Sequence, residues 1–312
     1  MELRPLGFGE IFDRAVTLYI RNFVPFAAIV MVLIVPFAIL QYVLALTEQP
    51  EYAAMINVLI NPSSARGTHI PTILDSPSAV AVTLLVVLFA YLIAPFVMNS
   101  VAVGVARLYR NRPVEFRACY AAVLHRWPQI LALMALEFVV VIGWYVGVVI
   151  VVMAFVFIAI ALATYVPVLG FALAIVAFVV TFILALLLLA PLLVALAFAM
   201  YAVVIEERDA IAGLQLGFAR VLNRTEFWRA LLFAIAVGAI TFGASTMFSV
   251  LAILAAMVHM AALQAVVQTL PTALINPFVV IVFAIYYFDV RIRREGYDLE
   301  ASLERLDPAE TA

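Results

Sequence analysis

Long runs of apolar residues are the feature that most limits how this chain can fold. Residues 128–163 and 171–204 are apolar almost throughout, and Glu137 is the only charged residue within them. A helix crosses the ~30 Å hydrocarbon core of a membrane with about 20 apolar residues, so each run is long enough. Because 68% of all residues are hydrophobic, 12% are charged and the alternation of barrel strands is absent, we predict an all-α, polytopic membrane protein.

Six such runs predict a bundle of six transmembrane helices. The first run follows about twenty mixed residues and is too long for the apolar core of a cleavable signal peptide. We place the helices at residues 23–46, 79–106, 128–163, 171–204 and 227–258, with the sixth ending near Val290. The polar residues 47–78 are interpreted as a loop, and a mildly polar segment with His259, Gln264 and Gln268 is expected to turn the chain.

The third and fourth predicted helices are longer than a membrane requires. At ~1.5 Å per residue each would extend about 50 Å, well beyond the hydrocarbon core. Strong tilt, a break near Gly143 and Gly147, or projection beyond the membrane would accommodate the excess length. We otherwise interpret these glycines, together with Gly238, Ser245 and Ser249, as small surfaces for close helix packing.

A short amphipathic segment precedes each pair of predicted spans. Its apolar residues recur at i, i+4, i+7 and i+8, which places them on one face of a helix. The three aligned stripes are Phe12, Val16, Tyr19 and Ile20; Phe116, Tyr120, Val123 and Leu124; and Leu214, Phe218, Val221 and Leu222. The pattern favours helices that lie in the headgroup layer of the membrane, and soluble caps packed on the bundle are the alternative.

The recurrence predicts one membrane domain made of three repeats, each a surface helix followed by a transmembrane hairpin. The repeats are expected at residues 1–106, 107–204 and 205–290, and the charged tail 291–312 is expected to be helical up to Leu306. Arginine supplies all seventeen cations of the chain, and sixteen of them fall on one side of this topology, with only Arg66 opposite. The positive-inside rule therefore predicts that both termini are cytoplasmic.

Proline and polar residues within the predicted spans are candidates for a site in the membrane. Pro95, Pro191 and Pro277 each lie about a dozen residues from the cytoplasmic end of the second helix of a hairpin, so we expect three kinks near the middle of the membrane. Glu137 lies ~15 Å into its span, where a charge is costly and usually faces a cavity or a partner. The alternative is that Glu137 lies near the headgroups or is neutral and hydrogen-bonded to a neighbouring helix.

Three polar residues beside the kinks have two interpretations as well. Asn99, Ser100 and Asn276 lie close to the prolines, so they are candidates for lining a site at the membrane midplane. Alternatively, their side chains satisfy the freed backbone groups or bond between helices.

Arginines of the surface helices are candidates for contacts with anionic lipid headgroups or a cytoplasmic partner. The positions are Arg14, Arg21, Arg117, Arg126, Arg220 and Arg224. Their alternative role is only to fix the topology, because interspersed acidic residues dilute the positive charge.

No motif in the sequence predicts catalysis. We find no Ser-His-Asp arrangement, P-loop or glycine-rich nucleotide turn, and no Cys/His grouping has the spacing of a metal site. Cys119 is the single cysteine and cannot form an internal disulfide. The net charge of −2 suggests no nucleic-acid partner. We therefore expect no catalytic, cofactor-binding or metal-binding residues.

Three segments together resemble a known family. They are LRPLGFGEIFDRAVTLYIRNF at the start, EERDAIAGLQLGFARVLNRTEFWR in the third surface helix, and YYFDVRIRREGYDLE near the end. The resemblance covers nearly the whole chain and is to six-span bacterial membrane proteins labelled as the membrane domain of glycerophosphoryl diester phosphodiesterases. It implies a location in the bacterial cytoplasmic (inner) membrane. No segment outside the spans is long enough for the ~250-residue catalytic barrel of the fused members, so the resemblance is to a stand-alone form.

These observations lead to two hypotheses for function. The first is a non-enzymatic scaffold or accessory protein that organises lipids, or binds a membrane or cytoplasmic partner, through its amphipathic helices. The low polarity of the spans favours it, since a solute pathway ordinarily needs more polar residues. The second is a transporter or lipid translocator with a midplane cavity at the proline kinks.

Overall fold

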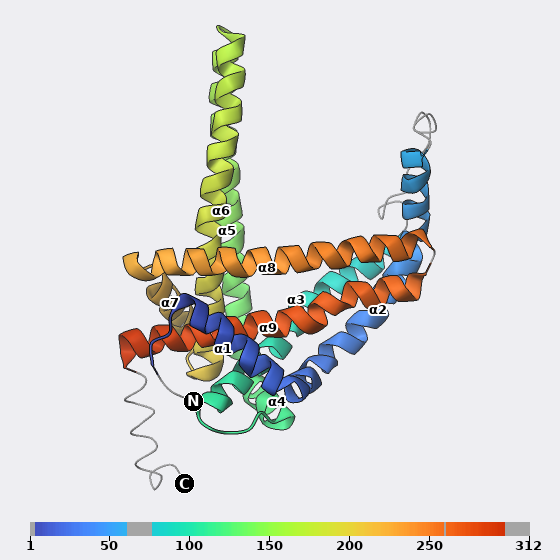
Figure 1. Ribbon diagram of the computed structural model, residues 1–312. Coiled ribbons are helices and arrows are strands. Elements are labelled where there is room, and N and C mark those ends of the chain that lie inside the picture. The colour runs from blue at the N-terminus through green and yellow to red at the C-terminus, as the bar shows by residue number, and fades with distance from the viewer. Residues whose placement is uncertain (1–3, 61–76, 259, 297–312) are drawn as a thin grey trace. The chain divides into compact units, whose positions relative to one another are not determined.

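The computed structural model describes residues 4–60, 77–258 and 260–296, and this part of the chain is helical without any strand. Its helices, in chain order, are α1 (Phe8–Arg21), α2 (Phe23–Ile60), α3 (Pro77–Tyr109), α4 (Phe116–His125), α5 (Trp127–Ala163), α6 (Pro167–Ile205), α7 (Ala210–Val221), α8 (Arg224–Met257) and α9 (Ala261–Glu295) (Figure 1).

Six of these helices contain segments that are long and apolar enough to cross a membrane. The segments are Phe23–Leu46, Ala79–Tyr109, Trp127–Ala163, Pro167–Ile205, Arg224–Met257 and Ala261–Glu295. The all-α class and the six predicted spans are therefore confirmed, and the fold is that of a multi-pass membrane protein. The three short helices α1, α4 and α7 each precede two of the long ones.

Two predicted connections are shorter than the sequence suggested. Helix α2 continues to Ile60, so the first part of the predicted loop at residues 47–78 is helical. Its residues 51–60 contain no glycine or proline and include alanine, glutamate, methionine and leucine, which have high helix propensity. Helix α9 already begins at Ala261, so Gln264 and Gln268 belong to a membrane-spanning helix. Residues 61–76 of the predicted loop, His259 and the tail beyond Gly296 lie outside the described residues.

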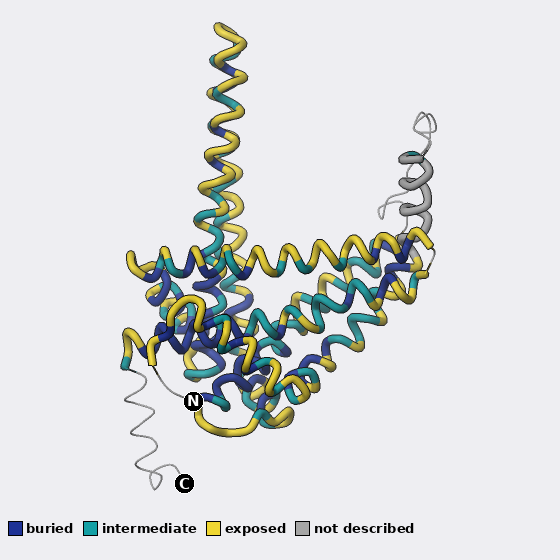
Figure 2. Tube along the Cα trace, in the orientation of Figure 1, coloured by how far each residue is buried: buried dark blue, intermediate teal, exposed yellow. Residues whose placement is uncertain are grey.

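The long helices run through the positions where breaks were considered. Helix α5 is continuous over 37 residues, so no break occurs at Gly143 or Gly147. Helix α6 continues over 39 residues with Pro191 inside it. At ~1.5 Å per residue, each of these helices is more than 50 Å long. Most residues in the outer part of this hairpin are exposed, as Figure 2 shows, and many of them are large apolar residues. A bilayer is the environment that accepts such a surface.

The chain forms two compact units. Unit 1 comprises Met1–His125 and Val237–Ala312, and unit 2 comprises Arg126–Ala236. In unit 1, α9 is the central helix: α1, α2 and α3 pack on it, and the ring of Tyr109 on α3 stacks on Phe288 with centroids 4.4 Å apart. In unit 2, α5 and α6 form a hairpin, and α7 packs closely on α6.

Candidate functional site: a polar pocket along α1

Helix α1 has three distinct faces. Ile11, Ala15 and Leu18 are buried, and α1 packs on α9. The predicted stripe lies one residue further round the helix, where Val16 is 43% exposed and Ile20 is 68% exposed. Within the stripe, the ring of Tyr19 contacts Phe278 of α9, whereas Val16 and Ile20 face away from the protein. These two exposed residues form an apolar surface beside the polar face.

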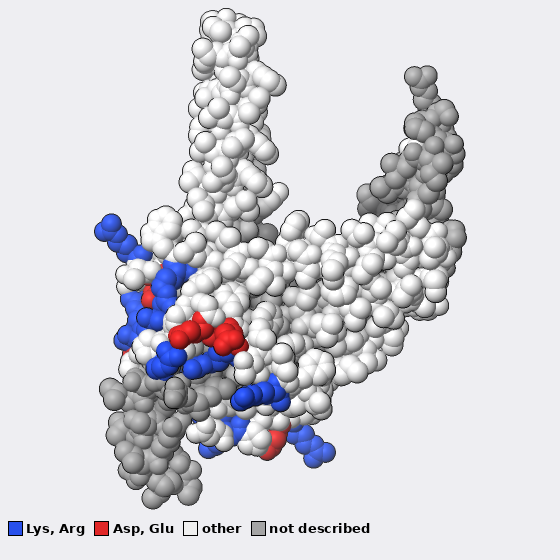
Figure 3. Space-filling view, in the orientation of Figure 1, with Lys and Arg blue, Asp and Glu red and all other residues white. Residues whose placement is uncertain are grey.

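The polar face of α1 borders a pocket of about 540 Å³. Three arginines and two acidic residues surround it, which makes it the most charged cavity described for unit 1. Its lining residues are Arg4, Leu6, Glu10, Asp13, Arg14, Thr17, Leu18, Arg21 and Asn22. Charged atoms appear around α1 in Figure 3, whereas the visible surface of the α5–α6 hairpin carries none. The pocket thus gathers Arg14 and Arg21, two of the arginines predicted to contact lipid headgroups.

Glu10 organises the entrance to α1. Its carboxylate accepts a hydrogen bond from the N–H of Gly7 at 2.7 Å and pairs with Arg4 at 3.0 Å. Gly7 is the N-cap, and Glu10 occupies the third helical position, where a carboxylate satisfies a backbone donor that the helix leaves free. The Gly7 hydrogen bond, followed by the Arg4 guanidinium, lowers the pKa of the Glu10 carboxyl from its usual value. Arg4 is thereby held at the rim of the pocket.

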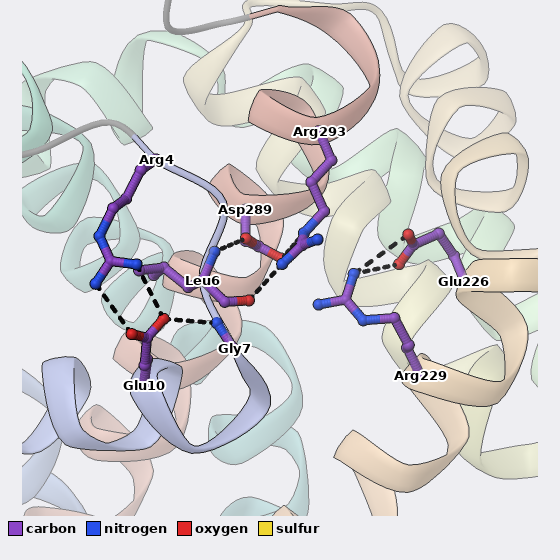
Figure 4. A network of polar contacts seen from close by, with 8 residues as sticks. All are labelled: Arg4, Leu6, Gly7, Glu10, Glu226, Arg229, Asp289 and Arg293. Carbon is purple, nitrogen blue, oxygen red and sulfur yellow. Dashed lines mark hydrogen bonds and ion pairs between the residues drawn. The ribbon is translucent and has the colours of Figure 1, made fainter.

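Asp289 of α9 fastens the segment before α1. One carboxylate oxygen, Oδ1, accepts the N–H of Leu6 at 2.6 Å, and the other, Oδ2, accepts Nε of Arg293 at 2.9 Å. Arg293 also donates to the carbonyl oxygen of Leu6, which closes a ring of contacts that we call the Asp289 clasp (Figure 4). Asp289 is fully buried, and a buried carboxylate requires such partners. The clasp joins the first and last of the three segments that carry the family resemblance.

Only part of this clasp is visible in the sequence. Arg293 and Asp289, like Arg291 and Glu295, have the i, i+4 spacing of ion pairs along a helix, and both pairs are present. The bond between Asp289 and Leu6 was missed because it involves a backbone group 283 positions away. No local pattern in the sequence marks such a partner.

The other candidate arginines lie in different surroundings. Arg220 of α7 is only 5% exposed and pairs with Glu206 at 2.8 Å, so a headgroup role does not fit it: its guanidinium is directed into the protein. Arg126 pairs with Glu207 at 2.8 Å. Arg117 and Arg224 are exposed. In unit 2, Glu226 and Arg229 form a further pair within the first turns of α8 (Figure 4).

The other short helices also pack through small residues. Gly213 and Gly217 of α7 face α6 so closely that a Cβ atom built at Gly217 would lie 2.9 Å from Cβ of Ala199. In α4, Cys119 is fully buried, and burial raises the pKa of its thiol. Beside it, the Tyr120 hydroxyl donates to the carbonyl of Ile29 at 2.8 Å, and burial raises the pKa of this hydroxyl to about 12.

The two glycines of α7, Gly213 and Gly217, were not predicted from the sequence as packing residues, although their spacing of four is a known packing signal.

The polar residues near the prolines either bond to their own helix or are exposed. The Asn99 amide donates to the carbonyl of Pro95 at 2.8 Å, and the Ser100 hydroxyl donates to the carbonyl of Phe96 at 2.9 Å. Asn276, in contrast, is exposed on α9. Within unit 1, Asn99 and Asn276 therefore do not converge on a common cavity. Near Pro277, the hydroxyl of Tyr19 donates to the carbonyl of Leu274 at 3.1 Å, which ties α1 to this part of α9.

Glu137 lies in unit 2, on the same helix as one wall of an apolar groove and before the first residue that lines it. Its Oε1 atom is buried and has no hydrogen-bond partner in the described part of the chain. The groove, of about 450 Å³, lies between α5 and α6 and is lined by Gly143, Trp144, Gly147, Val148, Val151, Phe155, Val180, Thr181, Leu184, Ala185 and Leu188. Gly143 and Gly147 were expected to pack closely, but Cβ atoms added to them would meet nothing within 4 Å. The two glycines leave space where larger residues would fill the groove.

Comparison with family models, with curated proteins and with solved structures finds no match to this chain. Among the described residues, no group of three or more His, Cys, Asp or Glu side chains is placed to hold a metal ion.

Proposed function

We propose that this protein is a non-enzymatic membrane scaffold that organises anionic lipids, or a protein partner, through its short amphipathic helices. The observation that carries the proposal is the arrangement on α1, where an exposed apolar stripe lies beside a pocket lined by three arginines. A helix of this kind buries its apolar side at the boundary of the acyl chains and directs its cations at headgroup phosphates. Membrane lipids are then the primary partners.

The proposed setting is the bacterial inner membrane, with both termini cytoplasmic. The concentration of arginines on one side of the six spans supports this orientation, and the resemblance to the stand-alone phosphodiesterase membrane domain supports the location. That family assignment is itself part of the proposal.

The proposed three-repeat architecture gains support from equivalent positions in the short helices. In the alignment of the three stripes, Ala15, Cys119 and Gly217 occupy the same position, and all three are small and buried. A small residue there lets each short helix approach the long helices closely, while Val16, Leu124 and Leu222 remain exposed. The order of one short and two long helices also recurs three times in the described chain.

Removing the arginines of the α1 pocket tests the scaffold proposal. In the double variant Arg14→Ala/Arg21→Ala, we expect the preference of the protein for spin-labelled phosphatidylglycerol over phosphatidylcholine to fall several-fold. Each arginine near an anionic surface contributes about 1 kcal/mol, which corresponds to about a fivefold change in association. Electron paramagnetic resonance of the protein reconstituted in vesicles measures this preference, and added salt should weaken it.

The matched control is Arg110→Ala/Arg208→Ala, which removes the same charge from two exposed loop positions outside the pocket. We expect this variant to retain most of the lipid preference. If the two double variants lose the preference equally, or if neither loses it, the α1 pocket is not a headgroup site and the scaffold proposal loses its main support.

A second candidate, a lipid translocator, is favoured by the apolar groove between α5 and α6. Trp144 and Leu184 both line the groove. Glu137 lies seven residues before Trp144, and Pro191 lies seven residues after Leu184, which is two helical turns in each case. In an antiparallel hairpin, the unpartnered carboxyl and the proline therefore lie at about the same level, at one end of an apolar groove that suits an acyl chain.

Replacement of Glu137 separates the two candidates. If the protein translocates lipids, Glu137→Gln should slow the movement of fluorescent phosphatidylethanolamine between the leaflets of reconstituted vesicles by about tenfold or more, because the ionisable group at the groove is lost. Glu115→Gln, which makes the same change in an exposed loop, should have no effect. If wild-type vesicles move the lipid no faster than protein-free vesicles, the translocator candidate is excluded.

A further inference from the structure

Unit 1 contains a second polar cavity, distant in sequence from the α1 pocket. It has a volume of about 390 Å³ and lies between α2, α8 and α9. Its lining combines two glutamines and two serines with apolar side chains: Gln41, Ser245, Phe248, Ser249, Ala252, Ile253, Gln268 and Pro271. None of these residues is charged. The cavity is therefore suited to a neutral group that accepts or donates hydrogen bonds, with apolar substituents attached to it.

The position of the two glutamines along their helices places this cavity at the far side of the membrane from the arginines. Gln41 lies 18 residues beyond Phe23, where α2 begins, and Gln268 lies 21 residues before Asp289 of the clasp. At ~1.5 Å per residue these separations are about 27 and 32 Å. Because the hydrocarbon core is ~30 Å thick, both carboxamides lie at the level where lipid chains join their glycerol esters in the opposite leaflet.

Two polar side chains that line the cavity have no hydrogen-bond partner in the described part of the chain. The Gln41 and Gln268 side chains make no hydrogen bond to any residue in the described part of the chain, so four N–H donors face the cavity region without a protein partner. The hydroxyl of Ser249, by contrast, donates to the carbonyl of Ser245 at 2.8 Å. Leaving carboxamides unpaired beside hydrocarbon is unfavourable, so a bound group that accepts their hydrogen bonds would stabilise the site.

We propose that this cavity binds the glycerol-ester region of a membrane lipid from the leaflet opposite the arginine-bearing helices. The carboxamide N–H groups of Gln41 and Gln268 donate to the ester carbonyl oxygens, and Phe248, Ala252 and Ile253 contact the acyl chains. The neutral lining selects for the ester region, which all diacyl lipids share, and not for a charged headgroup. The inference rests on the proposed function in one respect, namely that the arginine helices occupy one face of the membrane.

A photoactivatable diacylglycerol tests this site, because it carries the ester region without a charged headgroup. The protein is reconstituted in phosphatidylethanolamine vesicles that contain the probe, and the labelled peptides are identified by mass spectrometry. We expect labelling of the α8 segment that contains Phe248 and Ile253. In Gln41→Leu/Gln268→Leu, labelling should fall by about fivefold or more, since each lost hydrogen bond weakens binding by about fivefold.

Two comparisons make the test specific. A dialkylglycerol probe has ether oxygens in place of ester carbonyls and should label this segment about fivefold less than the diacyl probe. The matched control Thr246→Val/Thr272→Val removes two polar groups from the same helices outside the cavity lining and should label as the wild type does. Leucine is compatible with a membrane helix, so we expect the glutamine variant to fold, with a melting temperature no lower than that of the wild type.

Equal labelling by the ester and ether probes, or equal labelling of the wild type and the glutamine variant, would overturn the proposal. The result is separable from the test of the scaffold: Arg14→Ala/Arg21→Ala should change the preference for anionic lipid and leave the diacylglycerol labelling intact. If that variant keeps its anionic preference while labelling still depends on the two glutamines, the scaffold proposal fails and the ester site stands.

Discussion

At Asp289 a single carboxylate receives hydrogen bonds from opposite ends of the chain. It is fully buried, accepts the backbone N–H of Leu6 and pairs with Arg293, which in turn binds the carbonyl of Leu6. Every polar group in this arrangement has a partner, which is the condition under which a buried charge is tolerated. The segment that leads into α1, and with it Arg4 at the rim of the pocket, is thereby fixed to the central helix of unit 1.

The clasp predicts that Asp289→Ala is strongly destabilising. The substitution leaves the N–H of Leu6 without its acceptor and Arg293 without its counter-charge, for which we expect a cost of about 3 kcal/mol. Thermal unfolding in detergent micelles would show this as a fall in melting temperature. Glu207→Gln, which weakens the ion pair of an exposed carboxylate with Arg126, should cost about 1 kcal/mol or less. Equal effects of the two variants would contradict a special role of the clasp.

At the scale of elements, the short helices show which residues allow a helix to lie close against a bundle. Ala15, Cys119 and Gly217 face inward, and the larger apolar residues next to them remain wholly or partly exposed. At these three positions a large side chain would hold the helix away from the long helices. The exposed stripe residues Val16, Leu124 and Leu222 are then available to the acyl chains of the membrane.

Gly217→Ala tests this packing directly. The added Cβ would lie 2.7 Å from the backbone nitrogen of Ala199, so α7 or α6 must shift, and we expect a loss of about 2 kcal/mol of stability. The matched control is Gly238→Ala in α8, where the new methyl group would meet nothing within 4 Å. That change should be neutral or slightly stabilising, because alanine favours helix over glycine by roughly 0.5–1 kcal/mol. The melting temperatures of the two variants are compared with each other. A Gly217→Ala protein as stable as the control would disprove the close approach of α7 to α6.

At the scale of the whole molecule, the polar sites of unit 1 occupy two depths. The α1 pocket collects arginines near the ends of the chain, and the glutamine cavity lies about 30 Å along the helices from that region. A protein that binds phosphate headgroups at one depth and ester groups at the other would order lipids in both leaflets. The α5–α6 hairpin of unit 2 contributes a long apolar surface whose groove is suited to acyl chains.

The sequence by itself determined the membrane class, the number of spans and most of their limits. These properties depend on local hydrophobicity summed over about 20 residues, and the runs at 128–163 and 171–204 are unambiguous by that measure. The same reasoning located the three short helices, because a period of 3.6 residues is visible within each segment. It extended the loop after residue 46 too far, since polar residues at 47–52 conceal the helix-forming residues that follow.

Only the tertiary structure decided which face of each short helix packs and which polar groups meet. In α1, Ile11, Ala15 and Leu18 are buried whereas Val16 and Ile20 of the predicted stripe are exposed, because packing depends on the surface of the opposing helix. Leu6 bonds to Asp289, and Gln41 and Gln268 line one cavity, although the members of each pair are more than 200 positions apart. Such pairings follow from how the helices are placed in space, and hydrophobic patterns within a short window carry no record of them.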